Sequence, residues 1–157
     1  MFYYSHSFTT FAFLEFIMVK IELERLDKDF LMQAKNDRGD VVTLDASPAD
    51  GGQGKGFGPM QVLLAGMGGC SAIDVISILR KQREPLEDIK ITIEGEREPG
   101  AVPSLYQTVH AHFKLYGNIN QEKAQKAVAL SVEKYCSVAK TLEKTATITY
   151  SFEIIKP

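Results

Sequence analysis

Cys70 and Cys136 are the only two cysteines of the chain, and their residue type makes them the first candidates for chemistry. A thiolate is a nucleophile, and two thiols that meet can form a reversible disulfide. Their spacing fits neither a CxxC motif nor a metal-ligand pattern. Two other interpretations stay open at this point: a free cysteine that acts as a small buried hydrophobe, and a structural disulfide.

Two histidines and one aspartate are further candidates for a site. His110 and His112 point the same way from a predicted strand and could bind a metal. With no third ligand in view, a solvated strand face is the favoured interpretation, and neither a metal nor a cofactor is expected. Asp74 lies in an apolar segment, where a carboxylate must be hydrogen-bonded, and a structural role is favoured for it.

Composition excludes several classes of protein. The 157 residues are 45% hydrophobic and 24% charged, with a net charge of -2. A collagen, a disordered acidic tail and a disulfide-dense secreted module are incompatible with these values. Nucleic-acid binding is disfavoured because 18 basic residues meet 20 acidic ones without a basic stripe.

The first 17 residues are apolar and aromatic, but they do not match a targeting segment. They lack Lys and Arg, contain Glu15 and end without a small-residue cleavage pattern. We predict an N-terminal extension at residues 1–17, packed as a strand or strap, followed by one domain at residues 18–157. Without an export signal, a cytoplasmic location with reduced thiols is expected, and no membrane partner.

A long apolar segment at residues 60–79 is predicted to be a buried central helix. Pro59 suits the first helical position, and charged residues followed by Pro85 end the segment. Its length would span a bilayer, but Asp74 and three glycines, Gly66, Gly68 and Gly69, argue against a membrane helix. Glycine is unfavourable inside a helix, so these three predict that another backbone comes close there.

Alternating patterns predict strands on both sides of this helix. Three strands are expected before it, at residues 19–24 (half-buried), 30–35 and 42–44, with a turn at residues 36–39. Two follow it, at residues 89–93 and 109–116, then a helix capped by Asn118, a break at residues 135–137, a short helix and a final strand at residues 146–154. This order predicts an α+β fold.

Two segments resemble the two cysteine motifs of the OsmC/Ohr family, and most closely those of its YhfA-like branch. They are GPMQVLLAGMGGCSAIDV at residues 58–75 and SVEKYCSVA at residues 131–139. The resemblance covers roughly residues 19–155 and includes the order of the predicted elements. It implies an OsmC-like fold and an intertwined homodimer, with the long helices buried at its centre and antiparallel β-sheets wrapped around them.

The resemblance also implies a thiol-dependent peroxidase that reduces organic hydroperoxides. In that reaction Cys70 attacks the peroxide and becomes a sulfenic acid, Cys136 resolves it as a disulfide, and an external dithiol restores both thiols. An apolar site would suit the tail of such a substrate.

Two departures from the family pattern bear on this activity. The family carries a glutamate ten residues before its first motif cysteine, where this chain has Met60. The family's arginine, which stabilises the thiolate, cannot be placed, because Arg25 and Arg38 are out of register. Arg97, inward by strand alternation unless Gly95 introduces a bulge, is a candidate substitute. Without a cation the thiol would be a weak nucleophile, so the alternative is a non-enzymatic dimer that binds an apolar ligand or senses oxidants.

Overall fold

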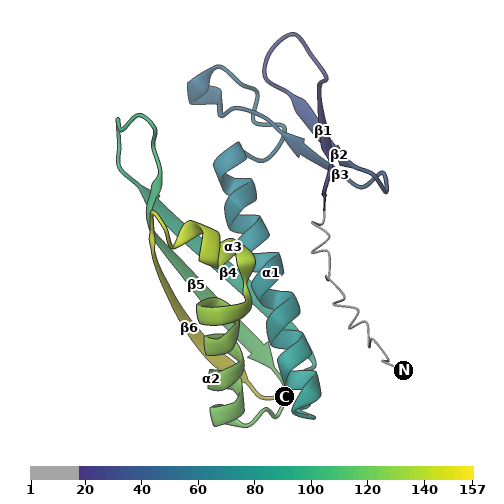
Figure 1. Cartoon of the computed structure of the whole chain (residues 1–157), viewed down its shortest axis with the longest axis vertical. Coiled ribbons are helices and arrows are strands. Elements are labelled where there is room, and N and C mark those ends of the chain that lie inside the picture. The colour runs from purple at the N-terminus through teal and green to yellow at the C-terminus, as the bar shows by residue number, and fades with distance from the viewer. Residues whose placement is uncertain (1–17) are drawn as a thin grey trace, which may run out of the picture.

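Two separate β-sheets divide the structure, a computed structural model that describes residues 18–157. The first sheet has the strand order β1-β2-β3, and the second has the order β4-β5-β6. Figure 1 shows the first sheet beyond the N-terminal end of the long helix α1, and the second sheet alongside the helices. This mixed arrangement confirms the predicted α+β class, while the predicted extension at residues 1–17 lies outside the described residues.

The first sheet is an antiparallel meander of short strands. Its strands are β1 (Ile21–Arg25), β2 (Met32–Asn36) and β3 (Val41–Leu44). The turn between β2 and β3 forms where it was predicted, because the Asn36 side chain accepts hydrogen bonds from the backbone of Arg38 at 3.0 Å and Asp40 at 2.9 Å.

The apolar residues of β1 are exposed, which corrects the prediction of a half-buried strand. Ile21 is 51% exposed and Leu23 is 59% exposed. Their alternation is that of a strand with one covered face, but nothing in residues 18–157 covers it.

A buried carboxylate organises the loop that joins this sheet to α1. Asp45 accepts hydrogen bonds from the backbone N–H groups of Ala46, Lys55 and Gln53 at 2.8, 3.0 and 3.1 Å. The bond from Lys55 is the largest cause that holds the pKa of Asp45 below its usual range. The glycine-rich segment therefore folds around Asp45, as a structural loop.

The long helix α1 (Pro59–Lys81) begins as the sequence predicts. Pro59 takes the first position, and the Gln61 side chain accepts a hydrogen bond from the Gly58 N–H at 2.8 Å. Only one face is fully buried, formed by Met67, Ser71, Val75 and Leu79. The opposite face is open, with Ile73 68% exposed, so a single chain does not bury this helix on all sides.

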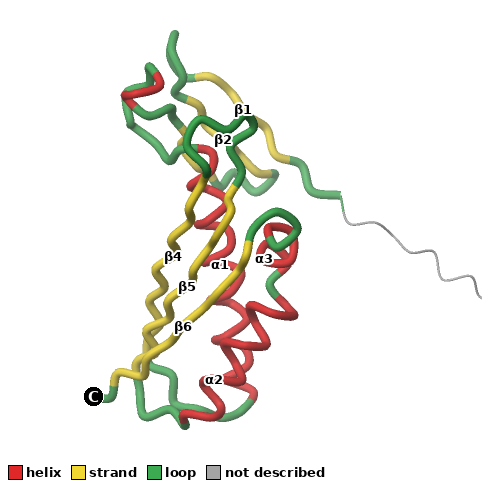
Figure 2. The backbone as a smooth tube through the Cα atoms, turned by 90° about the vertical axis from the view of Figure 1, so that its left-hand side faces the viewer, coloured by secondary structure: helices red, strands yellow, loops and turns green. Residues whose placement is uncertain are grey.

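By length and composition, α1 could also cross a membrane. Its most apolar window has a mean hydropathy of 1.9, and 22% of that window is buried. Core helices of globular proteins satisfy the same criteria. Here α1 packs against β4, α2 and α3, as both views show (Figures 1 and 2).

The second sheet and the helices form two layers around the core. β4 (Asp88–Arg97) and β5 (Tyr106–Tyr116) are antiparallel, whereas β6 (Thr147–Ile155) runs parallel to β5. The chain crosses between β5 and β6 through α2 (Gln121–Leu130), a π-helical turn (Ser131–Tyr135) and α3 (Ser137–Leu142). Figure 2 shows these helices and α1 on the same side of the sheet.

The alternation predicted for β5 is confirmed. Its inward residues Val109, Ala111, Phe113 and Leu115 are completely buried. One detail of the following helix was wrong: the N-cap of α2 is Asn120, which accepts a hydrogen bond from the Lys123 backbone at 3.1 Å, and Asn118 precedes it. Both asparagines fit the composition of a cap, and the loop length selects the second.

Candidate thiol site

A break in the helical layer positions Cys136. After α2 the backbone widens into the π-helical turn Ser131–Tyr135, closed by a hydrogen bond from the Cys136 N–H to the Ser131 carbonyl at 2.8 Å. The Tyr150 hydroxyl donates to Glu133 at 2.6 Å and ties this turn to β6. The predicted break is thus confirmed, and Cys136 becomes the N-cap of α3.

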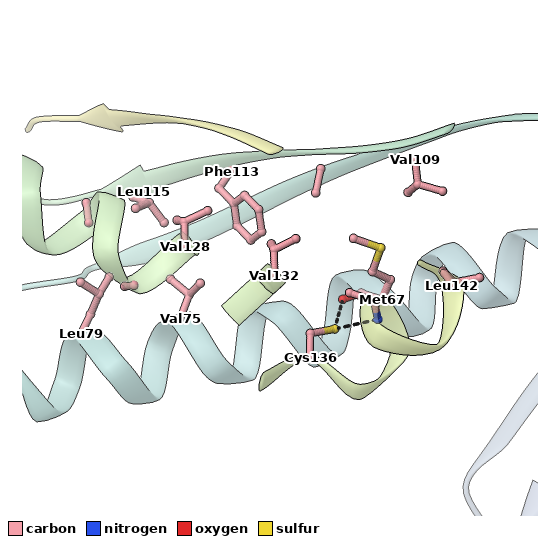
Figure 3. Close-up of a cluster of buried hydrophobic side chains, with 14 of the residues drawn as sticks. Met67, Val75, Leu79, Val109, Phe113, Leu115, Val128, Val132, Cys136 and Leu142 are labelled. Atoms are coloured by element: carbon pink, nitrogen blue, oxygen red, sulfur yellow. Dashed lines mark hydrogen bonds between the residues drawn. The ribbon is translucent and has the colours of Figure 1, made fainter. Parts of the chain in front are cut away.

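The Cys136 thiol bridges two helices inside the core. Its side chain is completely buried. Sγ accepts a hydrogen bond from the Ala139 N–H at 3.4 Å and donates one to the Met67 carbonyl of α1 at 3.7 Å, the two dashed contacts of Figure 3. Cys136 belongs to the buried apolar cluster drawn in Figure 3, and both of its hydrogen bonds are to backbone groups.

Cys70 lies on α1 close to Cys136 and to the first residues of α3, near enough for these groups to shift its pKa. Its residue is half-buried. Burial raises the pKa of the Cys70 thiol, and a side-chain hydrogen bond with Cys136 raises it further, whereas the backbone N–H groups of Val138 and Ser137 lower it. The net direction is upward. The fold therefore brings together two cysteines that come from different helices.

The arginines predicted as candidates do not reach this pair. Arg97 lies 5.9 Å from the centre of the Tyr106 ring, and the Tyr106 hydroxyl donates to the Met60 carbonyl at 2.8 Å. This places Arg97 near the beginning of α1, whereas Cys70 is roughly 15 Å further along the helix at about 1.5 Å per residue. Arg97 is also exposed, because the register shifts between Glu96 and Arg97, so its predicted inward position is wrong.

The other two arginines belong to the first sheet. Arg25 is the exposed last residue of β1, and Arg38 forms an exposed salt bridge with Asp40 at 2.9 Å. Among the groups that shift the pKa of Cys70 there is no cationic side chain of residues 18–157. Within one chain, the environment of Cys70 consists of burial, the second thiol and backbone N–H groups.

Within one chain, two of the three predicted glycines of α1 lie beside side chains and none lies against a second backbone. A Cβ on Gly68 would lie 3.4 Å from Ile93, and one on Gly66 would lie 4.0 Å from Val138. A Cβ on Gly69 would meet nothing within 4 Å. Gly68 and Gly69 also line an apolar groove of about 580 Å³ between α1 and β4.

The remaining candidates have structural surroundings. His110 Nε2 and His112 Nδ1 each lie 2.8 Å from the Ser151 hydroxyl on the outer face of the second sheet. No group of three or more potential metal ligands occurs in residues 18–157. Asp74 is half-buried, with its Oδ2 at 3.5 Å from the Ser131 hydroxyl.

Sequence reasoning missed two serines beneath the thiols. Ser71 and Ser131 are both completely buried, and the Ser131 hydroxyl donates to the Ser71 carbonyl at 3.3 Å. Ser131 lies three residues after Val128, a buried residue of α2, and Ser71 follows Cys70 directly. A small hydroxyl residue inside an otherwise apolar stripe is the signal that could have identified them.

The fold and site together define a class of protein: an α+β chain in which a cysteine of the central helix meets a second cysteine at a helix break. The family model described as "OsmC-like protein" matches residues 52–151. Because this match covers more than half of the chain, the protein belongs to the OsmC family.

Individual relatives agree with this assignment. Protein YhfA of Escherichia coli K12 is 44% identical over 118 residues, which cover 74% of this chain and 84% of YhfA. A hypothetical protein of Aquifex aeolicus VF5 superposes with a TM-score of 0.78 at 31% identity, over 90% of this chain and 99% of that one. The organic hydroperoxide resistance protein OhrB of Bacillus subtilis shares the fold, with a TM-score of 0.62 at 18% identity over 87% of this chain and 98% of OhrB.

Proposed function

We propose that this protein is a thiol-dependent peroxidase that reduces organic hydroperoxides with Cys70 and Cys136. The proximity of the two thiols is the observation that carries the proposal. It joins the only two cysteines of the chain across two helices, inside a family with structural neighbours named for organic hydroperoxide resistance.

The reaction divides the work between an accessible and a buried sulfur. The half-buried Cys70 attacks the outer peroxide oxygen as a thiolate, which breaks the O–O bond, gives a sulfenic acid and releases the alcohol after proton uptake. The buried Cys136 then attacks the Cys70 sulfur. Its thiol proton leaves with the sulfenic oxygen as water, and the disulfide that remains is reduced by an external dithiol.

The mechanism requires the Cys70 thiolate, and the raised pKa of Cys70 disfavours that form. Because burial and Cys136 raise that pKa, the thiolate is a minor species at neutral pH. The N–H groups of Val138 and Ser137 favour the charged form, and among residues 18–157 no cationic side chain adds to their effect on the Cys70 pKa. The protein should therefore react more slowly at neutral pH than a peroxidase whose thiolate is held by a cation.

A second copy of the chain is part of the proposal. The open face of α1 and the apolar residues of β1 would be in water in a single chain, and a continuous apolar surface of this kind marks an association site. A homodimer would cover both and shield Cys70 from solvent, and the free side of Gly69 leaves room for close helix packing. The redox cycle requires a reducing compartment, so we place the dimer in the cytoplasm.

Peroxide consumption by defined variants tests the proposed activity. Purified protein with dithiothreitol should consume cumene hydroperoxide, and Cys70→Ser should abolish that consumption. Treated with the hydroperoxide in the absence of dithiothreitol, Cys136→Ser should react once per Cys70 and accumulate its sulfenic acid, because no second thiol of the chain resolves it. Gln125→Ala, an exposed change on α2, is the control and should keep the full rate.

Two outcomes would contradict the proposal. Equal rates in Cys70→Ser and the unmodified protein would exclude Cys70 as the nucleophile. Complete inertness of the thiols toward the hydroperoxide, read as an unchanged intact mass, would favour the non-enzymatic alternative. Sedimentation at micromolar concentration tests the homodimer separately, and a monomer there would contradict it.

A further inference from the structure

The buried hydroxyl of Ser71 has no role in the resting site. It is completely buried, and among the described residues its Oγ has no hydrogen-bond partner. The other such atom in residues 18–157, Gln82 Oε1, lies beyond the C-terminal end of α1. A buried hydroxyl without a partner is unfavourable, so its presence beside the thiol pair calls for a physical reason.

The nearest acceptor on the same helix is already engaged by a cysteine. A helical serine can rotate its hydroxyl toward the carbonyl four residues earlier, which for Ser71 is that of Met67. In the dithiol form this carbonyl accepts the thiol proton of Cys136 at 3.7 Å. Ser71 and Cys136 can thus supply alternative donors to one carbonyl oxygen.

Disulfide formation removes one of these donors. When Cys136 attacks the sulfenic acid of Cys70, the S–S bond forms, the S–O bond breaks, and the Cys136 proton leaves with the oxygen as water. Cys136 then has no S–H, and the Met67 carbonyl loses its contact. A single rotation of the Ser71 side chain would replace the lost bond with a stronger O–H···O bond.

We propose that Ser71 is a positioning residue that stabilises the Cys70–Cys136 disulfide by donating to the Met67 carbonyl once the Cys136 thiol proton is gone. The inference rests on the proposed function. It assigns Ser71 no contact with the peroxide. Its hydroxyl is unsatisfied in the dithiol form and satisfied in the disulfide form, so it shifts the redox equilibrium toward the disulfide.

A redox titration of Ser71→Ala measures this shift. Equilibration with mixtures of reduced and oxidised dithiothreitol gives the equilibrium constant for disulfide formation. We expect Ser71→Ala to lower that constant about tenfold, equivalent to about 30 mV for a two-electron couple, because the variant relieves the dithiol and weakens the disulfide. Gln125→Ala, exposed on α2, should leave it unchanged.

A merely structural role is distinguished by unfolding each redox form. Ser71→Ala should leave unchanged or raise the unfolding free energy of the dithiol form, and lower that of the disulfide form. Equal changes in both forms, or none in either, would overturn the proposal.

A second test needs neither peroxide nor a disulfide. Cys136→Ala also removes the S–H donor, so in that background Ser71→Ala should shift the folding equilibrium about fivefold toward the unfolded state, whereas with Cys136 present it should not. A destabilisation of the same size in both backgrounds would refute the exchange of donors. Because no oxidant enters this cycle, thiols that are inert to hydroperoxide would sink the proposed function and leave this result standing.

Discussion

The two β-sheets are stabilised by opposite kinds of group. The second sheet rests on an apolar core in which Phe113 and Leu115 are completely buried against the helices. The first sheet and its loop, residues 18–58, contain one buried residue, the carboxylate Asp45. The second sheet and its helices bury their apolar residues within the chain. The first sheet and its loop pair backbone N–H groups with Asp45 but leave their apolar residues exposed.

This difference indicates that one region can fold within a single chain, whereas the other gains stability by association. The α1–α3 and β4–β6 body has the covered surface that folding requires, so it should carry most of the stability of one chain. The first sheet should gain its remaining stability when another surface covers residues such as Ile21 and Leu23.

Truncating one phenylalanine in each region should give the largest difference in stability between the two regions. Phe113→Ala removes a completely buried ring and should lower the free energy of unfolding by about 3–5 kcal/mol. Phe30→Ala removes a ring that is 51% exposed and should change a dilute monomer by less than about 1 kcal/mol. Denaturant titrations at two protein concentrations check both.

The concentration series also tests what covers the first sheet. If a homodimer buries Phe30, its truncation should cost more at high concentration than at low concentration. A loss from Phe30→Ala that equals the loss from Phe113→Ala in dilute solution would contradict the division into two regions.

Rising pH should increase the rate at which Cys70 reacts with peroxide. The pKa of Cys70 is raised, so at every pH below it the thiolate fraction and the rate of peroxide reduction should increase about tenfold per pH unit. A rate profile from pH 6 to pH 9 under excess dithiol measures this. A profile that is already flat above pH 7 would mean that a cation from outside residues 18–157 stabilises the thiolate.

Falling pH should instead destabilise the loop around Asp45 that follows the first sheet. The folded-state pKa of Asp45 is depressed, so its contribution is complete above the unfolded value of about 3.9 and is lost as the pH falls through the folded value. Asp45→Asn should produce the same opening at neutral pH, because an amide NH₂ would face the N–H groups of Gln53 and Lys55.

Hydrogen exchange resolves this smallest effect. The amides of residues 46–57 should exchange faster in Asp45→Asn, while those of β5 keep their protection. Asp37→Asn, an exposed change in the β2–β3 turn, is the matched control. Equal loss of protection in both sheets would show that Asp45 supports the whole molecule.

The sequence predicts the second sheet and α1 better than it predicts the first sheet. Alternation predicts the inward face of β5, and the cap and proline signals predict the start of α1, because these features depend on local residues. Exposure of β1 depends on what covers it, which alternation cannot reveal. The register shift between Glu96 and Arg97 could be anticipated only as a bulge at Gly95, because strand alternation by itself assumes an unbroken ladder.

The candidate site was predictable in its residues but not in its geometry. The motifs single out Cys70 and Cys136, and a helix break was expected beside the second. The contacts of Cys136 with Met67 and Ala139 involve backbone groups, which every residue carries, so no residue type indicates them. Buried Ser71 was missed for a related reason: its significance lies in a partner that it lacks.

The position of Cys136 beside Cys70 depends on the number of residues in the π-helical turn Ser131–Tyr135. A π turn holds one residue more than an ordinary α-helical turn, and each helical residue rotates the following chain by about 100°. Deleting any one residue of this turn would remove the hydrogen bond that joins the Cys136 N–H to a carbonyl five residues earlier, and this bond fixes Cys136 at the start of α3. Insertions and deletions here should therefore be tolerated far less than substitutions of the same residues.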